Sequence, residues 1–149
     1  MRALVQRVTR AEVRVEGRVV GAIGRGLLVL LGATHADDSA AADWLARKIA
    51  TLRVFADANG QMNHDLLETQ GQALVVPQFT LYGDARRGRR PDFLAAARPE
   101  QAEPLFERFC ASLAAAGVPV ASGVFRATME VELVNDGPVT LCIDTPAVA

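Results

Sequence analysis

Hydrophobic and polar residues alternate near the start of the chain, at the spacing of a β-strand. The segment Ala3 to Thr9 is rich in aliphatic residues, and Val13 and Val15 then alternate with charged residues. Neighbouring side chains in a strand point to opposite faces, so this pattern predicts strands with one buried face. Gly17 predicts a turn, after which Val19-Val20 begins another strand.

The run Leu27 to Leu31 is apolar at every position, which predicts a strand covered on both faces. This run also decides how the glycines before it are interpreted. Gly21, Gly24 and Gly26 are spaced like a phosphate-binding loop, but that motif requires a helix after it. Because a strand-like run follows instead, we interpret these glycines as part of a hairpin turn.

Two later segments change to a helical period. The first begins at Asp37-Asp38-Ser39, whose side chains can cap a helix, and continues with Leu45, Ile49 and Leu52 on one face. The second begins at Pro99, because proline is favoured in the first turn of a helix. The apolar face of this second helix consists of Leu105, Phe106, Phe109, Cys110 and Leu113. We therefore expect two long amphipathic helices.

Further strands are predicted on both sides of the second helix. Residues 72–82 read as one strand, and three short strands follow the helix, around Val118–Phe125, Thr128–Val134 and Val139–Ile143. No linker or repeat divides the chain. The order of elements predicts a single α+β domain over residues 1–149, with layered β/β/α architecture, mixed sheets and both long helices on one side.

The composition is that of an ordinary globular domain. Half of the 149 residues are hydrophobic, 22% are charged and the net charge is −1, so the overall charge indicates no particular partner. The longest apolar run is far shorter than the roughly 20 residues that a membrane-spanning helix needs. The first residues lack the apolar core of a signal peptide. We expect a cytoplasmic protein with no membrane partner.

Cysteine and histidine are too few to predict a metal centre. Cys110 and Cys142 lie within apolar segments, which predicts buried, reduced thiols, with a disulfide as the alternative. His35 and His64 lack the spacing of metal ligands. We predict no metal site and no cofactor.

The first candidate for chemistry is the polar corner Gln78-Phe79-Thr80, which follows the apolar run Leu74-Val75-Val76. Such a corner is either the edge of a strand or a substrate site. Thr80 carries a hydroxyl that could act as a nucleophile, but a hydroxyl needs a base to activate it. The sequence places no histidine, lysine or carboxylate obviously beside it, so no acid–base triad is predicted.

Four arginines form a second candidate: Arg86, Arg87, Arg89 and Arg90 lie within five residues of one another. A guanidinium is planar and suits a phosphate group, although such a charge run is equally consistent with a solvated loop. No aromatic signature of an RNA-binding module accompanies these arginines.

The third candidate is Gly137-Pro138, within Asn135-Asp136-Gly137-Pro138-Val139-Thr140. Asn-Asp-Gly is typical of a tight turn between two strands, here the last two of the chain. The proline fixes its own φ and makes a cis peptide bond accessible. The glycine has no Cβ, so its carbonyl can approach a ligand closely. The alternative is a hairpin turn with proline at the start of an edge strand.

Two motifs together resemble a known family. VPQFTL at 76–81 resembles the SQFTL motif of the D-aminoacyl-tRNA deacylases, and NDGPVT at 135–140 is similar to the second motif of that family, Asn-x-Gly-Pro-x-Thr. The order and separation of the motifs match, and the likeness runs from the first residues to Thr145. The resemblance therefore covers nearly the whole chain.

The resemblance implies a hydrolase that cleaves the ester between a D-amino acid and the 3′-terminal adenosine of tRNA, and that also removes glycine. It implies a homodimer in which Gly137-Pro138 of one subunit, with a cis bond, reaches the active site of the other. Backbone carbonyls would hold the substrate's ammonium, and the Gly137 carbonyl would exclude the side chain of an L-amino acid. Gln78, Phe79 and Thr80 would form the catalytic corner. Aminoacyl-tRNA is the implied partner, with no DNA.

The resemblance assigns further roles that the residues alone do not reveal. The tRNA's own 2′-hydroxyl would take part in catalysis, and main-chain N–H groups near Phe79 and Thr80 would stabilise the oxyanion. Gln78 would shape the pocket and Phe79 would pack near the adenosine, while Thr80 orients rather than attacks. The arginines at 86–90 become candidates for binding tRNA phosphates.

Two positions depart from the family pattern. Pro77 stands where serine is usual, and Arg126 stands where glycine is more usual. A sibling branch that removes L-alanine from tRNA carries Pro-Gln at this place, with a trans Gly-Pro bond, but Phe79 follows Gln78 here as in the D-specific branch. We therefore predict D-specificity. Activity on L-alanyl-tRNA, a noncatalytic tRNA-binding module and a threonine-nucleophile hydrolase are the alternatives.

Overall fold

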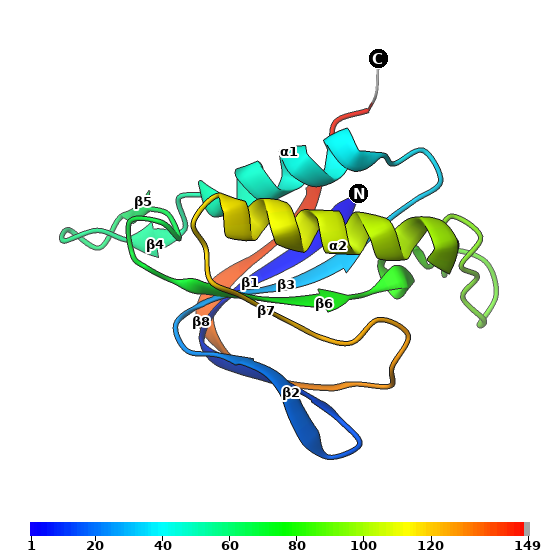
Figure 1. The fold of residues 1–149 in the computed structure, drawn as a ribbon, viewed down its shortest axis with the longest axis horizontal. Helices are drawn as coiled ribbons and strands as arrows, with labels where there is room; N and C mark the ends of the chain where they lie inside the picture. The colour runs from blue at the N-terminus through cyan, green and yellow to red at the C-terminus, as the bar shows by residue number, and fades with distance from the viewer. Residues whose placement is uncertain (148–149) are drawn as a thin grey trace.

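The computed structural model describes residues 1–147, which form eight strands, two α-helices and one short 3-10 helix (Figure 1). In chain order the elements are β1 (Arg2–Val15), β2 (Arg18–Ile23), β3 (Gly26–Gly32), α1 (Ser39–Ala50), β4 (Phe55–Ala56), β5 (Met62–His64), β6 (Gln72–Pro77), η1 (Phe79–Tyr82), α2 (Pro99–Ala115), β7 (Val120–Ser122) and β8 (Glu130–Asp144).

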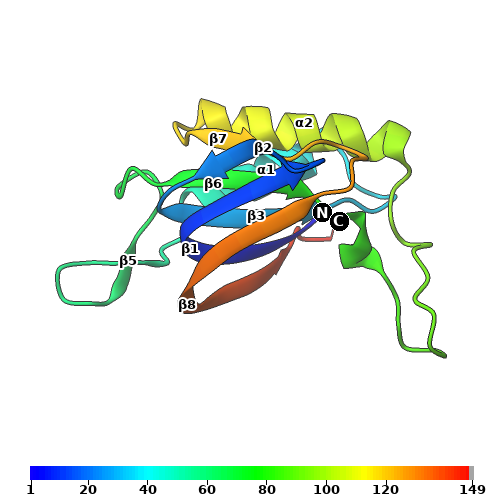
Figure 2. The same cartoon turned by 90° about the horizontal axis from the view of Figure 1, so that it is seen from below.

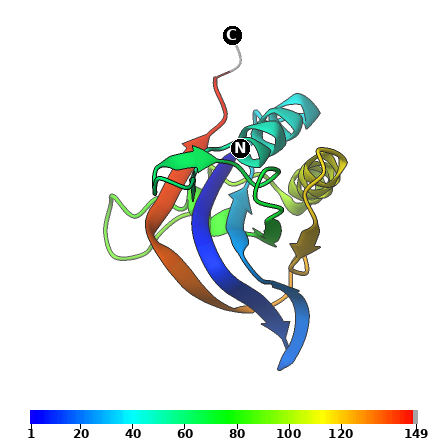
Figure 3. The ribbon, with the colours of Figure 1, turned by 90° about the vertical axis from the view of Figure 1, so that its left-hand side faces the viewer.

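Six strands form one mixed sheet, and β1 is the strand on which it is organised. The first half of β1 pairs antiparallel with β3, its second half pairs with β2, and β8 pairs with it along nearly its whole length. On the far side of β3, strands β6 and β7 continue the sheet in parallel. The long strands curve strongly, so the sheet curls toward a barrel (Figure 3).

The curled sheet has a hydrophobic core on each of its faces. One core lies between the sheet and the helices, and the other lies inside the curl of the sheet. Alternate residues of β3 belong to different cores: Leu27, Val29 and Leu31 pack toward the helices, whereas Leu28 packs between the β layers. Full burial of an aliphatic side chain contributes about 1.5–3 kcal/mol. The prediction of a strand covered on both faces is therefore confirmed.

Both helices pack on the same face of the sheet, side by side (Figures 1 and 2). The side chain of Asp38 caps α1 by accepting a hydrogen bond from the Ala41 amide at 2.9 Å. Helix α2 begins at Pro99 and buries Phe109 and Leu113 in the core. The α+β prediction is confirmed, and the two predicted β layers are parts of one curved sheet.

The predicted turn at Asn135-Asp136-Gly137 is wrong as a hairpin, because the two short strands around it are one strand, β8. Pairing with β1 is interrupted there and resumes at Thr140, which lies opposite Gln6. The Asn135 side-chain amide donates to the carbonyl oxygens of Arg7 (2.9 Å) and Val139 (3.1 Å). These bonds close the base of the bulge, so the chain keeps its direction instead of reversing.

The predicted strand over 72–82 is also too long, since β6 ends at Pro77 and η1 follows. Proline has no N–H to donate and commonly stands where strand pairing stops. β7 pairs with β6 only as far as Val75, so β7 no longer accompanies the chain at Pro77. At the start of the chain, the two predicted strand segments are one strand, β1.

Both cysteines are free thiols, as predicted. Cys110 is partly buried, and this burial raises the pKa of its thiol to about 11, so the thiolate is disfavoured. The prediction that Cys142 is buried is wrong, because it lies on an exposed face of β8. Within residues 1–147, no helix has the length and hydrophobicity needed to cross a membrane.

The contact between β3 and β6 tolerates no side chain at Gly26. A Cβ there would lie 1.8 Å from the Gln72 carbonyl oxygen, whereas a Cβ at Gly24 would lie 3.6 Å from the Gln72 side chain, an ordinary contact. We expect Gly26→Ala to lower the free energy of unfolding by about 1–3 kcal/mol or more, as overpacking does. Urea unfolding at a fixed protein concentration measures this. Gly24→Ala is the control, and equal midpoints for the two variants would contradict the packing argument.

Candidate active site

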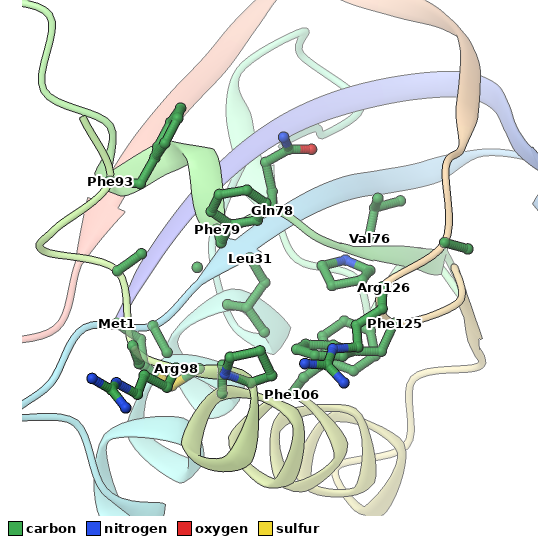
Figure 4. Close-up of a pocket in the computed structure, with 18 of the residues that line it drawn as sticks. Met1, Leu31, Val76, Gln78, Phe79, Phe93, Arg98, Phe106, Phe125 and Arg126 are labelled. Atoms are coloured by element: carbon green, nitrogen blue, oxygen red, sulfur yellow. The ribbon is translucent and has the colours of Figure 1, made fainter. Parts of the chain in front are cut away.

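A cavity of about 710 Å³ opens at the point where β3 and β6 end (Figure 4). Its volume is in the range of sites for small molecules. The walls come from Met1, the ends of β3 and β6, the start of η1, the segment before α2 with the first turns of α2, and the loop before β8 with the start of β8. Representative lining residues are Leu31, Pro77, Gln78, Phe79, Phe106 and Phe125.

The turn at Gln78 carries the predicted catalytic residues to this cavity. The backbone N–H of Gln78 donates to the Leu31 carbonyl at 2.8 Å. This bond continues the β3–β6 pairing one residue beyond Pro77. The chain then tightens into η1, and Gln78 and Phe79 line the cavity while Thr80 is exposed beside them. The structure therefore brings the three residues together at the mouth of one cavity.

The backbone amides of Phe79 and Thr80 are the available donors at this corner. They stand at the start of η1, where the first N–H groups of a helix have no partner within the helix. No acceptor in residues 1–147 forms a hydrogen bond with either amide. Two neighbouring amides of this kind can bind an oxygen atom that gains negative charge.

Thr80 is bonded to Gln78 and to no base. The Gln78 side-chain amide donates to the Thr80 hydroxyl in a short hydrogen bond, and no titratable group of the described chain bonds to that hydroxyl. This arrangement orients the hydroxyl without activating it as a nucleophile. Nor do the described residues contain a cluster of histidine, cysteine and carboxylate side chains able to hold a metal ion.

Phe79 and Phe93 form an aromatic wall at the cavity mouth. Their ring centroids are 5.3 Å apart and the rings meet edge to face at 71°. Phe79 is 57% exposed, so a large aromatic surface is left free to contact a ligand. Sequence reasoning did not assign Phe93 to the site, although an aromatic residue directly after the arginine loop is a signal that could have done so.

Arg2 anchors η1 to the sheet. Its guanidinium donates to the Leu81 carbonyl at 3.0 Å, forms an ion pair with Asp144 at 2.7 Å and lies over the Tyr82 ring, 5.0 Å from the centroid. Burial raises the pKa of Tyr82 to about 12, so its hydroxyl stays protonated at neutral pH. The corner Gln78-Phe79-Thr80 is thus held by contacts from both ends of the chain.

Gly137-Pro138 lies outside the cavity of its own chain. Leu31 at the cavity is opposite Ala3, whereas Thr140 is opposite Gln6 and the bulge lies beyond it, so about 13 Å along β1 separates them. The Gly137–Pro138 bond is cis, as the resemblance implies. Arg7 holds the preceding residue, donating to the Asp136 carbonyl at 3.1 Å and pairing with its carboxylate at 3.1 Å.

The four arginines at 86–90 lie on an exposed loop between η1 and α2. The backbones of Asp84 and Asp92 bond to each other across its base at 2.8 and 3.0 Å. Arg86 is paired with Asp84 at 2.6 Å, which lowers the pKa of that carboxyl to about 2. Arg87, Arg89 and Arg90 form no ion pair with any residue from 1 to 147, and the loop leads directly to Phe93.

Comparison with known proteins identifies the family. A sequence model described as D-Tyr-tRNA(Tyr) deacylase matches residues 4–144. A D-aminoacyl-tRNA deacylase from Symbiobacterium thermophilum is 61% identical over 145 residues, covering 97% of this chain and 96% of that protein. A D-aminoacyl-tRNA deacylase from Thermus aquaticus is 58% identical, with 97% and 95% covered.

Solved structures agree with this assignment. A protein named c-Myc DNA Unwinding Element Binding Protein superimposes with a TM-score of 0.92 at 42% identity, covering 99% of this chain and all of the other. A probable eukaryotic D-amino acid tRNA deacylase gives 0.83 at 20% identity, with 95% and 97% covered, and so supports the fold. With a match over nearly its full length, the chain belongs to the D-Tyr-tRNA(Tyr) deacylase family.

Proposed function

We propose that the protein edits charged tRNA in the cytoplasm, by hydrolysing the ester that joins a D-amino acid or glycine to the 3′-terminal adenosine. The observation that carries this proposal is the pair of unbonded amides at Phe79 and Thr80, at the mouth of a cavity with no acid–base triad. Such a site suits an ester, which needs its carbonyl oxygen stabilised more than it needs a protein nucleophile.

In the proposed reaction the substrate supplies part of the chemistry. The 2′-hydroxyl of the terminal ribose assists a water molecule that adds to the ester carbonyl, and the two amides stabilise the resulting oxyanion. The C–O bond to the ribose then breaks, releasing the free amino acid and restoring the 3′-hydroxyl. Preorganised donors of this kind contribute about 2.7–4 kcal/mol each in other enzymes. Gln78 and Thr80, bonded to each other, position the corner.

The choice between enantiomers is assigned to Gly137-Pro138 of a second copy of the chain. This bulge of β8 cannot reach the cavity of its own chain, since about 13 Å of strand lies between them. The Gly137 carbonyl of the other copy would stand where the side chain of an L-amino acid must go, whereas glycine and D-amino acids pass. Hydrogen bonds from Arg7 and Asn135 fix the bulge at Gly137-Pro138 in place.

A homodimer is therefore part of the proposal. β8 is paired only with β1 among the described strands, so its other edge is free to meet another chain. Val134 and Leu141 on β8 are about two-fifths exposed (40% and 39%), which suits an interface.

Activity on L-alanyl-tRNA is the second candidate, and Pro77 is the observation that favours it. Pro77 lines the cavity beside Gln78 and removes one backbone donor from its wall. Phe79 and the D-aminoacyl-tRNA deacylases among the relatives favour D-specificity.

We expect fast release of D-tyrosine from D-tyrosyl-tRNA and of glycine from glycyl-tRNA, with L-tyrosyl-tRNA and L-alanyl-tRNA unchanged. Parallel deacylation assays at equal enzyme concentration measure this. Release of L-alanine would transfer the protein to the second candidate. Binding of tRNA without hydrolysis of any substrate would support a noncatalytic binding module and refute the enzyme.

Gly137→Ala should reduce kcat/KM for D-tyrosyl-tRNA by about tenfold to 100-fold, because a Cβ would intrude where the backbone approaches the substrate. The new Cβ would lie 3.2 Å from the Asn135 side chain, which would have to shift by a few tenths of an ångström, so the midpoint of urea unfolding is measured beside the kinetics. Gly24→Ala, remote from the cavity, is the matched control and should behave like the wild type. Unchanged kinetics on both enantiomers would refute the role of Gly137.

The exposed arginines Arg87, Arg89 and Arg90 are proposed to bind phosphates of the tRNA, while Arg86 is already paired with Asp84. The plot of log(kcat/KM) against log[salt] has a negative slope. Changing the three arginines to glutamine should make this slope less steep by about 0.7–0.9 for each phosphate that is no longer bound. Arg86→Gln should change the slope less. Arg18→Gln, at the exposed start of β2, is the control for loss of charge alone. An unchanged slope in the triple variant would assign tRNA binding elsewhere.

A further inference from the structure

The cavity contains positive charge without any compensating negative charge. Arg98 and Arg126 carry the only charged side chains among the described lining residues, and no acidic side chain lines the cavity. The N-terminal ammonium of Met1, which also lines it, is paired with Asp37 at 2.5 Å. Neither guanidinium forms a hydrogen bond or ion pair within residues 1–147. Figure 4 shows Arg98 beside Met1 at one end of the cavity and Arg126 beside Phe125 at the other, with Phe106 of α2 between them.

This charge is not explained by the aminoacyl group, which carries a positively charged ammonium. Two arginines repel that ammonium and attract an anion instead. Both arginines are exposed at the rim of the cavity, so solvent and salt screen their attraction for an anion in part. An anionic part of the substrate is the group whose charge these arginines match.

The backbone at Arg126 adds an independent observation. Its φ is +68°, in the left-handed region that glycine adopts readily and other residues rarely adopt. Strained residues of this kind cluster at sites of ligand binding. The loop before β8 thus accepts an unfavourable conformation at the residue that brings a guanidinium to the cavity.

We propose that Arg126 binds the phosphate on the 5′ side of the terminal adenosine, and that Arg98 adds to the positive potential that draws this phosphate in. This inference rests on the proposed function, because it names a binding contact for the same substrate. The planar guanidinium matches the geometry of phosphate oxygens. Every charged tRNA carries this phosphate, whatever its amino acid, and Arg87, Arg89 and Arg90 continue the positive charge outward from the aromatic wall.

The test compares two minimal substrates that differ only in the group in question. One is adenosine esterified at its 3′-oxygen with D-tyrosine, and the other is the same ester of adenosine 5′-monophosphate. The wild type should show at least a roughly tenfold higher kcat/KM for the phosphorylated ester, through KM rather than kcat. In Arg126→Gly this ratio should fall to near one, and in Arg98→Gln it should fall less.

Arg126→Gly also separates binding from folding. Glycine relieves the left-handed conformation, so the midpoint of urea unfolding should stay the same or rise while the phosphate preference disappears. Arg18→Gln should retain the wild-type ratio. A variant that loses its phosphate preference only because it unfolds more readily would overturn the assignment.

The remaining outcomes are distinguishable from one another. A wild type that hydrolyses D-tyrosyl-tRNA yet treats the two minimal esters alike would overturn this inference and leave the proposed function intact. Arg126→Gly could instead lose activity on D-aspartyl-tRNA while keeping activity on D-asparaginyl-tRNA. The arginine would then bind an acidic side chain of the amino acid, and the phosphate proposal would be wrong. A wild type inactive on D-tyrosyl-tRNA would overturn both.

Discussion

The parallel pairing of β3 with β6 is the constraint on which the other features of this protein depend. The two backbones approach so closely at Gly26 and Gln72 that a single Cβ would not fit between them. Because β3 is covered on both faces, the same strand separates the helix-side core from the core between the β layers. The pairing continues through the Gln78 amide to Leu31, and there the chain turns into η1. The position of the corner Gln78-Phe79-Thr80 is therefore set by the same strand pairing that holds the fold together.

The division of the site between elements accounts for the chemistry proposed for it. Main-chain amides at the start of a 3-10 helix can be oriented by backbone geometry alone, so such a site requires no perturbed acid or base. The side chains around them are left to shape and to attract: Phe79 and Phe93 provide an aromatic surface, and Arg126 provides charge. In this account, selectivity comes from a rigid backbone element at Gly137, held by Arg7 and Asn135, and catalysis comes partly from the substrate.

Much of the fold could be predicted from the sequence, since local periodicity determined it. The apolar run Leu27–Leu31, the N-cap at Asp38 and the proline in the first turn at Pro99 are sufficient to predict β3 and both helices. The failure at residues 135–137 arose because long-range pairing overrode a local turn signal, whereas the predicted strand over 72–82 was too long because pairing stops at Pro77. Asn-Asp-Gly reads as a hairpin, but β1 pairs on both sides of it and keeps β8 continuous. The position of Arg98 and Arg126 in one cavity depends on tertiary contacts, which no spacing in the sequence reveals.

The central claim is that each active site combines the corner at Gln78-Phe79 of one subunit with Gly137 of another. It can be tested by co-expressing two differently tagged variants, Gln78→Ala/Phe79→Ala and Gly137→Ala, and purifying the dimer that carries both tags. A shared site predicts that this mixed dimer regains about half of the wild-type activity on D-tyrosyl-tRNA, because one of its two sites is intact. Activity no higher than the average of the two parent variants would contradict the claim and place the whole site within one chain.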